Sequence, residues 1–186
     1  MPPRVFFVLR NLLIKTVIKN NSSGTGLLSI TLASLVRRYT ATDIEALIPL
    51  IRKNITLNFP GWPDISSESP GSNIVAEELD WQLLESTPIS QRAKFFNFEP
   101  VDLLLVVDCI YHPSLLSSLV TTIDYLSIPG KTTVLIISEL RAEDVMREFM
   151  ETWLGKPGWE IWRIPNDVLG KHYAIWMGRK PLVMSL

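Results

Sequence analysis

The sequence predicts an α/β fold, with a mostly parallel β-sheet, helices on both faces and an antiparallel edge at the C-terminus. Two observations support this. First, apolar runs of strand length at residues 101–107 and 132–138 are followed by segments of helical periodicity at 114–126 and 142–154. Second, residues 159–164 and 172–177 alternate between apolar and polar, which predicts a hairpin-like pair at one edge of the sheet.

The N-terminal half continues the alternation of strands and helices. A helix beginning at Gly26 precedes a strand at residues 39–42, and residues 73–79 form a further strand. Residues 44–55 have helical periodicity, and Pro49 within them predicts a kink. Two stretches, 58–72 and from residue 82 to Pro100, are predicted to be irregular.

The first strand is doubtful. Residues 15–18 are only a weak strand candidate, and Lys19 and Asn21 would lie in a dry interior, which is costly for an unpaired charge.

Composition narrows the functional classes. The chain has 186 residues, which suits one domain, and its 18 basic and 19 acidic residues nearly cancel. This balance indicates neither nucleic-acid binding nor attachment to an anionic membrane, and no apolar run is long enough to span a bilayer. The lone Cys109 predicts a reducing, cytoplasmic location, and one cysteine with two histidines is too few for a structural zinc site.

Two regions carry candidate chemistry. The segment Ser22–Gly26 is typical of a glycine turn, and Asp43 ends the next predicted strand, so backbone amides and a carboxylate could meet a nucleoside cofactor. Asp108 and Tyr111 follow the 101–107 strand and predict a substrate site at the same sheet edge. The structural alternatives are an ordinary turn before a helix, and helix caps formed by the two aspartates.

Three further segments give these regions a resemblance. Asp108-Cys109-Ile110-Tyr111 matches an Asp-x-x-Tyr signature, Leu79-Asp80-Trp81 matches an Asp-Trp element, and Ser138-Glu139-Leu140-Arg141 follows the fifth strand. In this order they resemble the class I, seven-strand S-adenosylmethionine-dependent methyltransferases, specifically their protein-lysine branch and its fungal ribosomal members. The resemblance implies a Rossmann-like methyltransferase domain over residues 22–186.

The resemblance also implies roles for individual residues. It implies that the cofactor S-adenosyl-L-methionine is held through its methionine part, its ribose and its adenine by Ser23, Gly24, Gly26, Asp43, Asp80, Trp81 and Val107. Asp108 and Tyr111 would be catalytic, orienting the acceptor amine and lining its channel. The implied reaction is methyl transfer to a lysine side chain of a protein, with ribosomal proteins as candidate substrates and neither nucleic acid nor membrane as partner.

The start of the chain departs from this pattern. Asn20 stands where relatives carry an acid, and Ser22 replaces their first glycine. We therefore expect residues 1–21 to be a non-family segment produced by truncation or a mispredicted start. The alternative to an enzyme is a catalytically weak or inactive methyltransferase-fold module that acts through a partner surface.

Two other enzyme classes fit less well. A nicotinamide-dependent enzyme would accommodate Asp43 but has no place for the Asp-Trp and Asp-x-x-Tyr elements. Nucleic-acid methyltransferases that act on base amines carry prolines where this chain has Cys109-Ile110.

Overall fold

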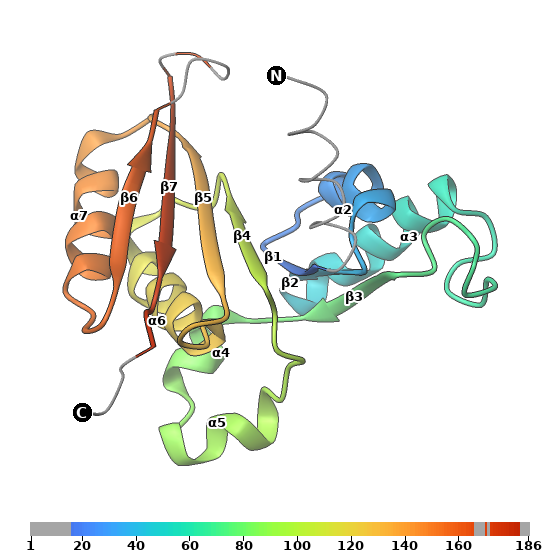
Figure 1. The fold of residues 1–186 in the computed structure, drawn as a ribbon, viewed down its shortest axis with the longest axis horizontal. Coiled ribbons are helices and arrows are strands. Elements are labelled where there is room, and N and C mark those ends of the chain that lie inside the picture. The colour runs from blue at the N-terminus through green and yellow to red at the C-terminus, as the bar shows by residue number, and fades with distance from the viewer. Residues whose placement is uncertain (1–15, 166–169, 171, 183–186) are drawn as a thin grey trace. The chain divides into compact units, whose positions relative to one another are not determined.

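The computed structural model describes residues 16–165, 170 and 172–182 (Figure 1). The chain divides into two compact units, one up to Leu79 and one from Asp80 onward, and each is described by itself. Residues 1–15, most of the predicted N-terminal segment, lie outside the described residues.

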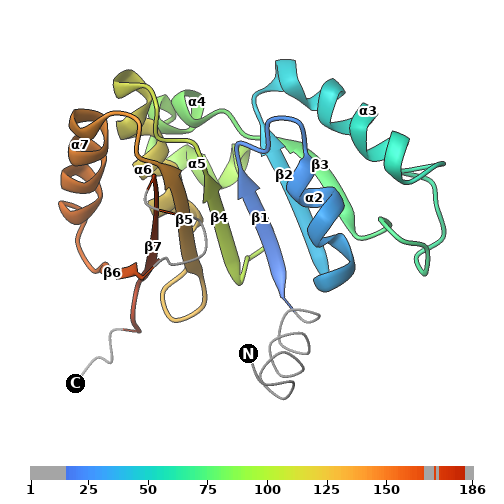
Figure 2. The same ribbon diagram turned by 90° about the horizontal axis from the view of Figure 1, so that it is seen from above.

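In the residues described, the first unit is a three-stranded parallel sheet with the helices α2 and α3 (Figure 2). Its strands, in the order β3-β2-β1, are β1 (Val17–Asn21), β2 (Arg38–Asp43) and β3 (Ile74–Glu78). Its helical elements are α2 (Leu27–Leu32), η1 (Ala33–Leu35), η2 (Glu45–Leu47) and α3 (Ile48–Asn58).

Helix α3 packs its apolar side on the sheet. Ile51 and Ile55 are fully buried, as is Tyr39 on β2. A Cβ on Gly26 would lie 3.2 Å from Ile51 Cγ2, so a small residue is needed where the turn before α2 approaches α3. Burial of one face of the helix therefore holds the Ser22–Gly26 turn against α3.

Two local predictions in this unit are wrong. Pro49 does not kink a helix, because it lies in the first turn of α3, where its missing N–H has no helical partner to lose. Asp43 does not cap the following helix, because the N-cap of η2 is Ile44 and that helix has no side-chain cap hydrogen bond. The doubtful first strand forms β1, and all five of its residues are buried.

The second unit contains four strands in the order β4-β5-β7-β6. β4 (Leu103–Val107) and β5 (Thr133–Glu139) are parallel, and β7 (Tyr173–Arg179) runs antiparallel to both β5 and β6 (Glu160–Ile164). The helical elements are α4 (Trp81–Ser86), α5 (Ile89–Phe95), η3 (Pro113–Leu115), α6 (Leu116–Leu126) and α7 (Glu143–Leu154). The antiparallel C-terminal edge is thus as predicted.

Aliphatic strands and an aromatic cluster form the core of the second unit. Leu104, Val106 and Ile136 are fully buried. Phe149 and Trp153 of α7 pack at 5.7 Å between ring centroids. A Cβ on Gly178 of β7 would collide with the Trp153 indole, so that strand position requires glycine.

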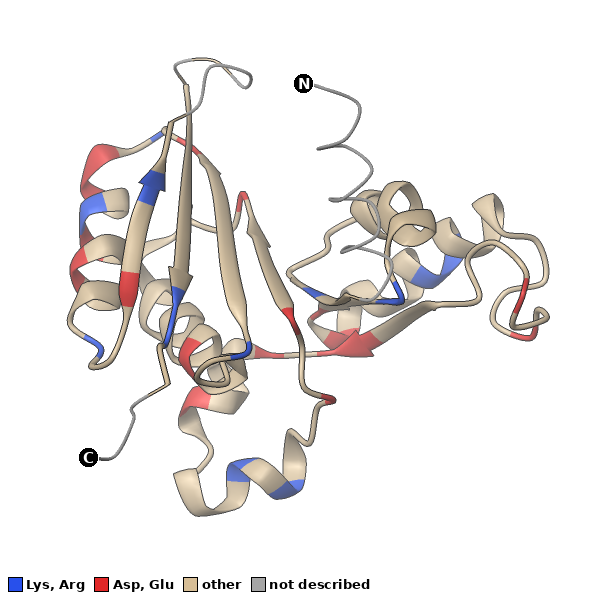
Figure 3. Ribbon diagram, in the orientation of Figure 1, with Lys and Arg blue, Asp and Glu red and all other residues tan. Residues whose placement is uncertain are grey.

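The prediction of an irregular stretch up to Pro100 is wrong, since α4 and α5 lie there. Helix α5 has no buried residue, so it lacks the apolar face that sequence periodicity detects. Acidic and basic residues are interspersed, notably along α7 (Figure 3). None of the helices in the described residues is both long enough and apolar enough to span a bilayer.

Candidate functional site

The turn between β1 and α2 is fastened to the end of β2 by one carboxylate. Asp43, only 6% exposed, accepts hydrogen bonds from the Gly24 N–H at 2.8 Å and the Ser22 hydroxyl at 3.3 Å, both on Oδ2. Its Oδ1 accepts the Ile44 N–H at 2.9 Å. The structure therefore brings together the glycine turn and the acid that the sequence singled out.

Three residues of the turn have positive φ. Gly24 (φ 55°) and Gly26 (φ 79°) adopt the left-handed region without a steric penalty. Ser22 (φ 64°) adopts it as a non-glycine residue, at a steric cost that glycine, the residue of relatives at this position, does not have. No atom of the described residues lies within 4 Å of a Cβ built on Gly24, so this part of the chain leaves open space on that side of the turn.

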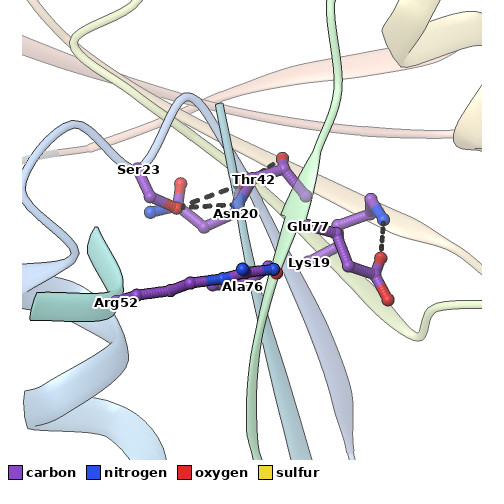
Figure 4. Close-up of polar contacts among 7 residues, drawn as sticks. All are labelled: Lys19, Asn20, Ser23, Thr42, Arg52, Ala76 and Glu77. Atoms are coloured by element: carbon purple, nitrogen blue, oxygen red, sulfur yellow. Dashed lines mark hydrogen bonds and ion pairs between the residues drawn. The ribbon is translucent and has the colours of Figure 1, made fainter. Parts of the chain in front are cut away.

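Ser23 joins the ends of β1 and β2 (Figure 4). Its backbone N–H donates to the Thr42 carbonyl at 2.7 Å, and its hydroxyl accepts the Thr42 N–H at 3.1 Å. The Thr42 hydroxyl in turn donates to the Asn20 carbonyl at 2.7 Å. Ser23, which was expected to contact the cofactor, therefore also aligns the strand ends that carry the turn.

Lys19 lies inside this sheet with a charged partner. Its side chain is 2% exposed, and Nζ lies 3.2 Å from Glu77 Oε2 on β3 (Figure 4). Burial lowers the pKa of Lys19 to about 8, against the opposing effect of Glu77. Lys19 is therefore not an unpaired buried charge, because Glu77 on β3, two strands away in the sheet, pairs with it.

In the second unit, Asp80 and Trp81 begin α4. Asp80 is its N-cap, and Oδ1 accepts the N–H groups of Gln82 at 2.9 Å and Leu83 at 3.1 Å. The Trp81 side chain is largely buried, with 9% of the residue exposed. Asp80 is therefore a helix cap and Trp81 a largely buried residue, and adenine binding by them stays a prediction.

Asp108 lies just beyond β4, where Val107 ends the strand. Its φ is 53°, and its N–H continues the ladder by donating to the Ile137 carbonyl at 2.8 Å. Asp108 does not cap the helix that follows, because neither η3 nor α6 has a side-chain cap. Tyr111, three residues on, is 55% exposed.

Asp108 forms an ion pair with Arg141, which the sequence interpretation did not predict. Arg141 Nη2 lies 2.7 Å from Asp108 Oδ2, and Arg141 Nε lies 2.7 Å from Glu139 Oε2. The hydrogen bond to Glu139 and the charge of Asp108 raise the pKa of Arg141. β4 and β5 are parallel neighbours, so their carboxyl ends lie side by side. The sequence signal for this contact was therefore Asp108 after one strand and Glu139-Leu140-Arg141 at the end of the other.

Metal chemistry has no cluster to support it in the described part of the chain: no group of three His, Cys, Asp or Glu residues lies there in position to hold an ion. Cys109 is buried, and its thiol faces the Val107 carbonyl at 3.2 Å. The polar groups of the candidate site in the described residues are carboxylates, hydroxyls, backbone amides, the Arg141 guanidinium and the exposed Tyr111 phenol.

Comparison with solved structures identifies the fold, and a family model identifies the family. An O-methyltransferase from Bacillus cereus, solved in complex with SAH, superposes with a TM-score of 0.61 at 16% identity, covering 96% of this chain and 81% of that chain. This likeness confirms the predicted Rossmann-like methyltransferase fold. A family model described as lysine methyltransferase matches residues 15–154, which include β1, the glycine turn and Asp108. The chain belongs to the lysine methyltransferase family.

Two curated fungal proteins are similar over parts of their length. One is ribosomal lysine N-methyltransferase 5 of Eremothecium gossypii, 26% identical over 73% of this chain and 48% of that protein. The other is a diaminohydroxyphosphoribosylamino-pyrimidine deaminase of Schizosaccharomyces pombe, 32% identical over 88% of this chain and 36% of that protein. The chain thus spans less than half the length of either relative. The predicted boundary at residue 22 stays a prediction.

Proposed function

We propose that this protein transfers a methyl group from S-adenosylmethionine to a lysine side chain of a protein substrate, with ribosomal proteins as first candidates. The match to the lysine methyltransferase family carries this proposal, because it spans both the cofactor turn and the Asp108–Tyr111 segment. Similarity to ribosomal lysine N-methyltransferase 5 supports the choice of ribosomal proteins to test.

The first unit supplies residues that fit the cofactor. S-adenosylmethionine, when bound, supplies a methyl group activated by its sulfonium. Asp43 keeps a fourth lone-pair position on Oδ1 beyond its three hydrogen bonds in the described chain, and ribose hydroxyls are suitable donors to it. The open space beside Gly24 lets a ligand approach the turn backbone. We assign Ser23, Gly24, Gly26 and Asp43 to the methionine and ribose parts.

In the second unit, Asp108 has the chemistry to orient the acceptor. Arg141 binds Oδ2, and no hydrogen bond within the described residues reaches Oδ1, which can accept one from the lysine amine. During transfer the N–C bond forms as the C–S bond breaks, and positive charge develops on the nitrogen. A carboxylate at that point stabilises this charge, and the amine proton then leaves to solvent.

Tyr111, Asp80, Trp81 and Val107 complete the proposed assignment. The exposed phenol ring of Tyr111 can pack against the lysine alkyl chain or its cation. Both cap bonds of Asp80 within the described residues are made by Oδ1, so Oδ2 can accept from the adenine amine, while Trp81 contributes ring surface and Val107 contributes backbone.

Asp108→Asn tests the proposal most directly, with Asp43→Asn as the matched variant on the cofactor side. Binding of S-adenosylmethionine is measured by calorimetry, and transfer by incubation of purified ribosomes with methyl-labelled cofactor followed by analysis for methyl-lysine. We expect Asp108→Asn to bind the cofactor within about threefold of the wild type but to lose about 100-fold or more in transfer. Asp43→Asn should lose cofactor affinity first.

Two results would contradict the proposal. If the chain bound the cofactor but formed no methyl-lysine in ribosomal or other proteins, lysine would be rejected as the methyl acceptor. No binding at millimolar cofactor would favour the inactive methyltransferase-fold module. Preserved transfer by Asp108→Asn would reject the role of Asp108 alone.

A further inference from the structure

We propose that the Ser22 hydroxyl competes with the ribose of S-adenosylmethionine for Asp43, and that Ser22 therefore lowers the affinity of this chain for its cofactor. The inference rests on the proposed use of this cofactor and on Asp43 as its ribose ligand. It concerns a residue that stands where relatives carry glycine.

The Asp43 carboxylate has too few free lone pairs for a ribose diol. An ionised carboxylate offers about four acceptor positions. Gly24 N–H and the Ser22 hydroxyl occupy Oδ2, and the Ile44 N–H occupies Oδ1, so one position remains. A ribose that donates from both its 2′- and 3′-hydroxyls needs two. One of the three donors must therefore leave before the diol can bind fully.

Ser22 is the donor best able to leave. The Gly24 and Ile44 donors are backbone N–H groups, at 2.8 and 2.9 Å, fixed by the turn and by the strand end. The Ser22 bond is longer, at 3.3 Å, and its hydroxyl turns about a single side-chain torsion. Ser22 is half-buried, so its hydroxyl can be solvated after it turns away. The diol consequently replaces a bond that already exists, and the gain on binding is smaller.

The backbone conformation at position 22 favours glycine over serine. Ser22 has φ 64°, in the left-handed region that glycine adopts freely and a residue with a Cβ adopts at a cost. Its hydrogen bond to Asp43 offsets part of that cost in the cofactor-free chain. The same hydroxyl thus stabilises the empty turn and opposes the bound one.

Two substitutions separate the hydroxyl from the strain. Ser22→Ala removes the hydroxyl but keeps the Cβ at positive φ, whereas Ser22→Gly removes both. The dissociation constant of S-adenosylhomocysteine is measured by calorimetry for the wild type and both variants, alongside thermal unfolding. A 3′-deoxyribose analogue serves as the matched ligand, because its single remaining donor needs only the position that is already vacant.

We expect both variants to bind S-adenosylhomocysteine about 3- to 10-fold more tightly, the range of a typical single hydrogen bond, because the Ser22 bond is long for one made to a carboxylate. Neither variant should bind the 3′-deoxy analogue more tightly through Asp43. Ser22→Gly should also unfold at a higher temperature than Ser22→Ala, since only glycine relieves the strain.

Unchanged or weaker binding by Ser22→Ala and Ser22→Gly would overturn the competition, and weaker binding would make Ser22 a ligand of the cofactor. An equal gain for the 3′-deoxy analogue would also overturn it, because the effect would not depend on the diol. Either result leaves methyl transfer intact. If neither the wild type nor either variant binds S-adenosylhomocysteine at millimolar concentration, the proposed use of S-adenosylmethionine as cofactor is rejected as well.

Discussion

The two units bury chemically different strands. In the first unit the buried residues of β1 and β2 include Lys19, Asn20, Asn21, Thr40, Thr42 and Asp43. In the second unit β4 and β5 bury Leu104, Leu105, Val106, Val134 and Ile136. A buried polar group is stable only with its specific partner, whereas an aliphatic side chain needs only apolar surroundings and good packing. The first unit should therefore respond to loss of single partners and to pH, and the second to changes of volume.

The largest effect should come from removing the carboxylate that fastens the cofactor turn. Asp43→Ala leaves the Gly24 and Ile44 N–H groups and the Ser22 hydroxyl without their acceptor. We expect the free energy of unfolding to fall by about 3 kcal/mol, mainly from the two backbone N–H donors, because the Ser22 hydroxyl can turn to water. Urea unfolding measures the change.

Asp108→Asn is the matched control in the second unit. Asp108 is 43% exposed at its side chain and its ion pair with Arg141 is at the surface, so we expect a loss under about 1 kcal/mol. Asparagine also tolerates the positive φ of this position. Equal losses at positions 43 and 108 would show that burial of the carboxylate does not distinguish the two units.

Lys19→Met should act in the opposite direction and depend on pH. The folded-state pKa of about 8 lies below the ordinary value of 10.5, so the unfolded chain binds more protons between pH 8 and about 10. The wild-type free energy of unfolding should therefore rise over this range. Lys19→Met removes the rise and should stabilise the chain at pH 7 by about 2 kcal/mol, because Glu77, 36% exposed, is left where water reaches it.

The measurement is urea unfolding at intervals from pH 7 to 10. It stops there because burial raises the pKa of Tyr39, so that above pH 10 the unfolded chain loses that proton first and stability falls. Lys53→Met, an exposed position on α3, controls for the loss of a lysine. A parallel rise with pH in Lys19→Met and wild type would exclude Lys19 as its source.

Interchanging hydroxyl and methyl groups tests the comparison in both units at once. Thr42→Val keeps the shape of a fully buried side chain but removes the bond to the Asn20 carbonyl. Val106→Thr places a hydroxyl in a fully buried aliphatic strand. Each should lower the free energy of unfolding by about 1–2 kcal/mol, the first through a lost bond and the second through an unpaired hydroxyl.

Chemical denaturation of both single variants gives these values. If Thr42→Val were neutral while Val106→Thr was destabilising, the first unit would be as tolerant of apolar residues as the second. The polar interior of β1 and β2 would then not be a requirement of the fold.

The sequence predicted the second unit's strands more readily because their composition is simple. Residues 101–107 and 132–138 are apolar runs, and β4 and β5 lie within one residue or two of those bounds. β1 carries Lys19, Asn20 and Asn21, which is the composition of a loop, yet it is fully buried. The buried charge of Lys19 is paired by Glu77, 58 residues later in the chain, and no local pattern shows that pairing.

The same limit applies to the candidate site. Strand-end position placed Asp43 beside the turn correctly, because parallel strands bring their carboxyl ends to one edge. The resemblance implies adenine binding for Asp80, and its bonds to Gln82 and Leu83 show that it is also a helix cap. The contact of Asp108 with Arg141 depends on side-chain reach between loops, which strand spacing does not determine.

The smallest expected effect belongs to a polar contact of the second unit that lies between helices rather than within the sheet. Glu85 of α4 accepts hydrogen bonds from the Ser117 and Ser118 hydroxyls of α6, and these bonds lower its pKa. Because the folded pKa lies below the unfolded one, this contribution is present above about pH 4.5 and is lost as pH falls through the folded pKa.

Glu85→Gln should lower the free energy of unfolding by under about 1 kcal/mol at pH 7 and should remove the loss of stability in acid. Thermal unfolding from pH 7 to 3 measures both effects. Glu148→Gln, exposed on α7, is the control. A loss as large as that of Asp43→Ala would show that the second unit also depends on single polar partners, and the contrast between the units would then reduce to the composition of their strands.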